Sequence, residues 1–353
     1  MRRSISLFIC VFISLFLLSE VAARRSHFTQ EQKSQLAKVN NIYVKVLALT
    51  ERGRGDTAPI LTLISRRLEE MGYTIVTDRK QPHDVEFRVK CEERKKWTQT
   101  TTSGGDNDHL DNPTRLWKGP ACIMGYYLKG QDAGWHREVR TDFENADAAA
   151  KAANIKKAGD YALDQLRIKL EDYDFPIKLA AEWGQDFRLL ALLKDTKTPK
   201  KKKLRILSVM TTLQSHDALP YLQDILQDKD MTLDAISALV ATGSDGIPLL
   251  SEIFNNPQEP STVRAAAAEG LGKIGAATGN PKITPPILHY LEVNLPTIKT
   301  STDIDFSVLT EVVWGLGKLR SEDSIPPMRK LEKKVWLIYD KSEAMTELRE
   351  AVD

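Results

Sequence analysis

A short amphipathic helix with a proline in its first turn is predicted four times in the second half of the chain. The four segments align without gaps on Pro220, Pro248, Pro286 and Pro326. Each proline is followed two residues later by Leu or Met, and three residues further on by Ile or Leu, which is the spacing of one helix face. Proline suits the first helical turn because the N–H that it lacks would have no partner there.

A second helix is predicted between successive prolines. The segments that begin at Val263 and Val308 both contain Gly-Leu-Gly-Lys at the same offset. Helix pairs that recur at intervals of 28 to 40 residues predict an α-solenoid, in which each pair covers the apolar side of the next. We therefore expect Leu271 to be buried, and Gly270 and Gly315 to lie where neighbouring helices approach closely.

These repeated segments resemble the HEAT-repeat family of armadillo-like α-solenoids. Units of that family start with a proline-bearing helix and continue with a Val-Arg-Ala-type helix, as the segment from Val263 does here. The resemblance covers roughly the last half of the chain. It implies a scaffold or adaptor that binds a protein partner along a grooved surface, without catalysis.

A different periodicity precedes the repeats. Strictly alternating residues at 84–91 predict a half-exposed strand, with Val85, Phe87 and Val89 on its apolar face. The order strand, helix, four strands, helix predicts an α+β domain, an antiparallel-rich sheet with two helices on one face. In element order this domain is similar to small α+β domains of bacterial envelope proteins. The expected elements are strands 42–50, 73–78, 84–91, 122–128 and 135–141, and helices that end at Gly72 and span 145–170.

The expected domains are a signal peptide at 1–23, an α+β domain at 24–175 and a HEAT-like solenoid at 176–353. An apolar helix at 177–193 is expected to open the solenoid by packing against the α+β domain. Six lysines between positions 194 and 203 predict a solvated loop between helices. The alternative is an anchor for phosphate or an anionic polymer.

The first residues have the three parts of a secretory signal peptide. A basic start at Met1–Arg3 precedes an apolar run from Ile5 to Leu18, and Val21 and Ala23 are the small residues expected before a cleavage site. We therefore expect an exported protein, periplasmic or extracellular. The alternative is a retained membrane anchor, although the apolar run is shorter than the about 20 residues that span a bilayer.

Charge and hydropathy narrow the classes of partner. Residues 1–23 carry Arg2, Arg3 and Glu20, so their removal lowers the formal net charge from +2 to +1. A nearly neutral chain is not typical of a dedicated nucleic-acid binder. No later apolar run is long enough to cross a bilayer, so we expect no integral membrane protein after processing.

Cys91 and Cys122 are the only cysteines left after residues 1–23. An exported protein keeps disulfides, and the predicted strands bring these two residues together where one strand ends and the next begins. We therefore predict a disulfide between them. The alternative is two free buried thiols in a reducing compartment.

The connection from Glu92 to Ala121 is unusually long for a compact domain. Trp97 and Trp117 lie near its ends. One reading is a β-ribbon with paired tryptophans, and the other is a platform for a sugar, peptide or partner helix. The second reading gives an alternative function, a cell-envelope module that binds glycan or lipid through the α+β domain.

Two motifs resemble ligand-binding sites, one for a nucleotide and one for a metal ion, but neither has the surrounding sequence that such a site requires. Residues 270–275 spell the dinucleotide fingerprint, but a helical segment precedes them where the fingerprint needs a strand, so we expect no nucleotide. The loop with Asp106, Asp108, His109 and Asp111 lacks calcium-loop spacing, and we expect no metal. With scattered histidines and no nucleophile motif, we expect no enzyme and no cofactor.

Overall fold

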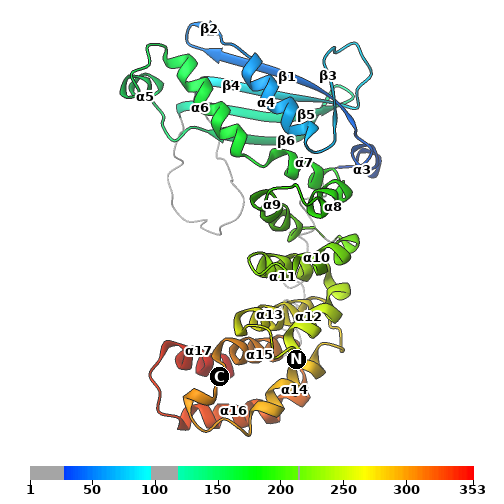
Figure 1. Ribbon diagram of the computed structural model, residues 1–353, viewed down its shortest axis with the longest axis vertical. Coiled ribbons are helices and arrows are strands. Elements are labelled where there is room, and N and C mark those ends of the chain that lie inside the picture. The colour runs from blue at the N-terminus through cyan, green and yellow to red at the C-terminus, as the bar shows by residue number, and fades with distance from the viewer. Residues whose placement is uncertain (1–27, 97–117, 214) are drawn as a thin grey trace, which may run out of the picture. The chain divides into compact units, whose positions relative to one another are not determined.

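The computed structural model describes residues 28–96, 118–213 and 215–353 (Figure 1). They form two compact units that divide between Arg188 and Leu189. The first, the α+β unit, contains a mixed sheet with helices, and the second, the solenoid unit, is a run of helices. The predicted fold class, an α+β domain followed by an all-α solenoid, is confirmed.

One mixed sheet organises the α+β unit. Its strand order is β2-β1-β4-β5-β6, and β3 pairs with β1. The pairings of β1 with β3 and with β4 are parallel, and the other three are antiparallel. The strands are β1 (Asn41–Thr50), β2 (Gly53–Arg54), β3 (Thr74–Val76), β4 (Val85–Lys96), β5 (Lys118–Leu128) and β6 (Gln131–Arg140).

Two helices, α4 (Ala58–Glu69) and α6 (Ala158–Asp172), lie over one face of the sheet (Figure 1). The alternation predicted for β4 is confirmed, because Val85, Phe87 and Val89 are buried. Burial of each such side chain stabilises the fold by about 1.5–3 kcal/mol. Glu86 points to the other face yet is also buried, and it is compensated by ion pairs with Arg88 at 2.7 Å and Arg79 at 3.5 Å.

The single helix expected at 145–170 is two helices, α5 (Ala146–Ala152) and α6. Asn154 adopts a left-handed conformation with φ of 58°, and the N–H of Ile155 donates to the Ala150 carbonyl at 2.8 Å. These bonds close a helix end, and asparagine tolerates the left-handed region better than most residues.

The helix expected at 177–193 is also divided, into α7 (Phe175–Glu182) and α8 (Asp186–Lys194), by Gly184 with φ of 68°. The expected boundary at 175/176 lies inside the α+β unit, which extends to Arg188. The segment packs against the α+β domain as expected, but α7 is part of that unit and not the first helix of the solenoid. The Trp183 ring, which follows α7, contacts the rings of Tyr73 and Tyr126, with centroids 5.6 Å and 5.2 Å apart. An apolar helix face fits a sheet as well as another helix, so its pattern does not specify the neighbour.

Gln185 ties the end of this unit to its beginning. Its side chain is fully buried, and its amide donates to the carbonyl oxygens of Leu36 at 2.9 Å and Val39 at 2.8 Å. The Tyr73 hydroxyl donates to its Oε1 at 2.8 Å. Leu36 is the last residue of α3 (Gln30–Leu36), a short helix that precedes the sheet.

The predicted repeat is confirmed in the solenoid unit. Prolines stand in the first turns of α10, α12, α14 and α16, and α11, α13, α15 and α17 are the second helices. The helices are α9 (Lys200–Met210), α10 (Leu219–Ile225), α11 (Thr232–Ala241), α12 (Ile247–Asn255), α13 (Ser261–Thr278), α14 (Thr284–Asn294), α15 (Phe306–Leu319), α16 (Ile325–Leu337) and α17 (Glu343–Val352).

The residues predicted to form the apolar stripe are buried in α10 and α12, but in α14 and α16 the first buried position differs from the predicted one. Leu222 and Leu250 are fully buried as expected. In α14 and α16 the residue one position earlier, Ile287 or Pro327, is buried instead, and Leu288 and Met328 are half-buried. The buried positions of these two helices are spaced by four residues, which places them on a neighbouring line of the helix surface.

Glycines allow the second helices to meet closely. A Cβ atom on Gly272 would lie 2.9 Å from the Cα atom of Gly315, where α13 and α15 cross. A Cβ atom on Gly270 would lie 2.5 Å from Cγ2 of Val240. Leu271 between them is fully buried, as predicted. None of the helices within the described residues combines the length and the hydropathy that a bilayer-spanning helix needs.

Candidate functional site

The two tryptophans predicted as a binding platform, Trp97 and Trp117, lie outside the described residues, and so does the loop from Gly104 to Asp111. Pairing of β4 with β5 extends to Lys96 opposite Lys118. The ribbon and platform readings of the tryptophans both stay predictions.

Cys91 and Cys122 are directly opposite one another in the β4–β5 register, and both are fully buried. Their Sγ atoms are bonded as a disulfide. The two residues lie inside their strands, and not at the strand ends as expected, because β4 continues to Lys96 and β5 begins at Lys118.

The lysine-rich segment is only partly a loop, because α9 begins at Lys200 and includes the last four of the lysines. Lys200 Nζ lies 3.5 Å from Asp228 Oδ1 and also contacts Asp230. The hydrogen bond to Asp230 raises the pKa of Lys200 above its ordinary value. This lysine is thus held in ion pairs within the solenoid unit, which favours the structural reading of the segment over an anion anchor.

Three carboxylates that the sequence did not single out meet in the α+β unit. Oxygen atoms of Glu51, Glu93 and Asp147 lie within 4.8 Å of one another. Glu93 is buried and accepts a hydrogen bond from the Glu51 N–H at 2.8 Å. Carboxylate oxygens are ligands that Ca²⁺ and Mg²⁺ accept, but three separate segments supply them, so no sequence spacing announces the group.

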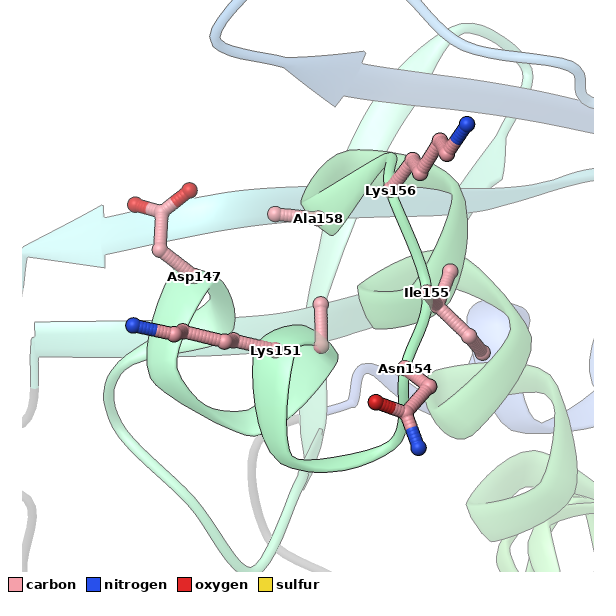
Figure 2. Close-up of a pocket in the computed structure, with 7 residues that line it drawn as sticks. Asp147, Lys151, Asn154, Ile155, Lys156 and Ala158 are labelled. Atoms are coloured by element: carbon pink, nitrogen blue, oxygen red, sulfur yellow. The ribbon is translucent and has the colours of Figure 1, made fainter.

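An open depression of about 420 Å³ lies between α5 and the start of α6 (Figure 2). Asp147 and Lys151 border it from α5, and Lys156 borders it from the connection between the two helices. Figure 2 shows the charged ends of Lys151 and Lys156 pointing away from one another. Enzyme sites need convergent polar groups, and these groups diverge.

A second depression, of about 400 Å³, lies between α3 and the end of α7. Phe28 and Trp183 supply its aromatic walls, and Lys33 and Glu182 supply charged groups. This combination of rings with polar groups suits an amphiphilic ligand.

The most distinctive surface is on the solenoid unit, where α13, α15 and α17 lie side by side (Figure 1). Their exposed or half-buried residues follow one stripe on each helix, and we call the surface that they form the Trp314 face. Trp314 itself is 43 % exposed. The face is formed by Thr262, Ala266, Glu269 and Lys273 of α13, Ser307, Glu311, Trp314 and Lys318 of α15, and Glu343, Glu347 and Glu350 of α17.

Charges on the Trp314 face act on one another across the three helices. Burial raises the pKa of Glu311, and Glu269 of α13 and Glu347 of α17 raise it further. Lys318 and Lys273 act in the opposite direction. Glu311 of α15 is thus close enough to charged side chains of α13 and α17 for their charges to affect it.

Trp314 was missed by the sequence analysis, although the repeat contained a signal for it. In the alignment of α13 with α15 on Gly-Leu-Gly-Lys, Trp314 stands where α13 has Glu269. The charged residue in α13 indicates that this position faces solvent, and a large aromatic residue is unusual at such a position. Its exposure, however, depends on how α15 is rotated against its neighbours, which the alignment does not give.

Comparison with known families matches residues 263–292, which span α13 from Val263 and most of α14, to the PBS lyase HEAT-like repeat. No curated protein matches the chain, and neither does any solved structure. The match falls on the unit with the fullest Val-Arg-Ala pattern, and the helices on either side repeat its arrangement. The second unit is therefore a HEAT-like solenoid.

Proposed function

We propose that this protein is a non-catalytic scaffold or adaptor that binds a protein partner through the Trp314 face of its HEAT-like solenoid. HEAT-like repeats suggest protein interaction, and stacked helix pairs create extended binding surfaces. The observation that carries the proposal is Trp314, a large ring 43 % exposed in the middle of a charged face. We propose that the partner is a protein and that the face binds neither nucleic acid nor nucleotide.

Tryptophan is a strong candidate for the main contact. Residues that dominate binding energy in protein interfaces are enriched in Trp, Tyr and Arg, and they lie near the centre of the interface within a polar rim. Trp314 has that arrangement, because Glu311, Lys318 and Glu269 surround it on α15 and α13.

The test is capture of a partner from cell-envelope extract, comparing the full chain with two matched variants. Trp314→Ala should weaken capture by about tenfold or more. Trp336→Ala is the control, because Trp336 is also exposed, at 57 %, but lies on α16. Equal capture by the parent and Trp314→Ala would show that this face is not the contact.

Export belongs to the same proposal. The segment at 1–23 has the pattern of a secretory signal peptide, and the disulfide between Cys91 and Cys122 is of a kind that persists in oxidising compartments. Cell fractionation and the intact mass of the isolated protein test this. A chain that starts at Arg24 in the exported fraction supports it. A full-length chain in the membrane fraction supports the retained anchor instead.

The second depression favours an alternative function, binding of an envelope glycan or lipid by the α+β unit. Its aromatic walls at Phe28 and Trp183 and its charged groups at Lys33 and Glu182 are the supporting features. Titration of the full chain with glycan fragments and with lipid vesicles tests it, using Phe28→Ala as the variant. Saturable binding that this change abolishes would favour the alternative.

A further inference from the structure

The chemistry of the partner can be inferred from the charges on the Trp314 face, and this inference rests on the function proposed above. Carboxylates outnumber ammonium groups there. Lys273 Nζ is already paired with Glu269 Oε1 at 2.6 Å. Glu343 and Glu350 stand about one turn on either side of Glu347, so α17 presents carboxylates only along this stripe.

Glu311 lies where that negative charge is concentrated. It is half-buried, and the groups that face it are Glu269 and Lys273 from α13, Glu347 from α17 and Lys318 from its own helix. Burial together with the two neighbouring carboxylates raises its pKa. A carboxylate held in this way is stabilised when a cation arrives, because the cation offsets both the lost hydration and the repulsion.

Trp314 adds a second feature that favours a cation. It follows Glu311 by three residues on α15, so the two side chains are neighbours on the helix surface. The face of an indole ring attracts guanidinium and ammonium groups, and more strongly where water is excluded. Within the described part of the chain, no other aromatic ring stacks on Trp314.

We propose that the Trp314 face binds a positively charged segment of a partner protein, with an Arg or Lys side chain over the Trp314 ring and its charge between Glu311 and Glu347. The same carboxylates would repel nucleic acid and anionic lipid. An exposed basic stripe does exist in this unit, but it lies on α16, at Arg329, Lys330 and Lys333.

The experiment measures fluorescence anisotropy of two labelled peptides of equal length, an Arg-Ala repeat and a Glu-Ala repeat, with the full chain. It is done at physiological salt, where the Debye length of about 8 Å suppresses long-range attraction. The Arg-Ala peptide should bind saturably and the Glu-Ala peptide should not. Glu311→Gln combined with Glu347→Gln should raise Kd about tenfold, as should Trp314→Ala.

The control variant removes two carboxylates elsewhere on the same unit, Glu322→Gln with Asp323→Asn, both exposed before α16. It should leave Kd unchanged. Equal weakening by the control pair would mean that the peptide responds only to total charge, and the proposal fails. It also fails if the Glu-Ala peptide binds or if neither peptide does.

These outcomes separate the two proposals. If capture from extract depends on Trp314 while the Arg-Ala peptide does not bind, the solenoid still binds a protein there, but not through a cation. If neither capture nor peptide binding depends on Trp314, both proposals are wrong.

Discussion

At the scale of single residues, packing in the solenoid is decided by which glycines face another helix. Gly272 and Gly317 occupy equivalent positions in the two Gly-Leu-Gly-Lys segments, but their surroundings differ. A Cβ atom on Gly272 would lie 2.9 Å from the Gly315 Cα atom, whereas one on Gly317 would have no atom within 4 Å. The second glycine of the motif is therefore required for close helix packing in α13, at Gly272, but not in α15, at Gly317.

We predict opposite effects of alanine at these two positions. Gly272→Ala should lower the free energy of unfolding by about 1–3 kcal/mol, because the backbones of α13 and α15 must separate. Gly317→Ala should be neutral or stabilise by up to about 1 kcal/mol, since a helical glycine gains from replacement where space is open. Urea unfolding of both variants measures this, and similar values for the two would contradict it.

Leu271 provides a second prediction at this scale. Because the side chain is fully buried, Leu271→Ala should lower the free energy of unfolding by about 2–5 kcal/mol. Leu271→Asp should cost more, since it buries a charge as well. Thermal unfolding that matches the parent would place this residue outside the core.

The disulfide can also be tested by replacing both cysteines. Its cysteines are 31 residues apart, and closing a loop of that length stabilises a protein by roughly 3.5 kcal/mol through the unfolded chain. Cys91→Ser with Cys122→Ser should therefore unfold at lower denaturant concentration. Two alkylatable thiols in freshly isolated native protein would show instead that the bond does not form.

At the scale of elements, the exposed stripe of α15 carries a cost in stability at Glu311. Glu311 has a raised pKa in the folded protein. A carboxyl group with a raised pKa binds its proton more tightly in the folded state, so ionisation as the pH rises lowers stability. Ionisation of Glu311 therefore lowers the stability of the folded protein.

Glu311→Gln should therefore raise the melting temperature at pH 7. The gain should shrink as the pH falls through the raised pKa and vanish below the ordinary range for glutamate, where the parent is protonated in both states. The same variant should bind the Arg-Ala peptide more weakly. Melting curves across pH test the first part, and a gain that did not depend on pH would contradict it.

The sequence predicted elements well where their signals were local. Prolines at 220, 248, 286 and 326 marked helix starts, and alternation at 84–91 marked a strand with the correct buried face. Two predicted helices were each divided in the structure, at Asn154 and Gly184. A single residue in the left-handed region ends a helix without disturbing its apolar periodicity, so the pattern alone did not reveal either break.

At the scale of the whole molecule, the sequence predicted two parts but not the extent of the first. The boundary predicted at 175/176 assigns residues 177–182 of α7 to the solenoid, yet the Trp183 ring that follows them contacts the rings of Tyr73 and Tyr126 in the α+β unit. The Trp314 face was likewise not predicted, because it depends on how three helices that are not consecutive in the sequence are rotated against one another. Local patterns specify elements, while tertiary packing decides which faces remain exposed.

The hydrogen bonds of Gln185 also constrain the order of events during synthesis. Its partner Leu36 precedes it by 149 residues, so at about 5–20 residues per second the ribosome makes the two roughly 7 to 30 seconds apart. During that interval the carbonyl oxygens of Leu36 and Val39 lack the hydrogen bonds from the Gln185 amide. The α+β unit therefore cannot complete these contacts until Gln185 has been synthesised. In a nascent chain paused before Gln185, the segment around α3 should be more accessible to proteases than in the finished protein.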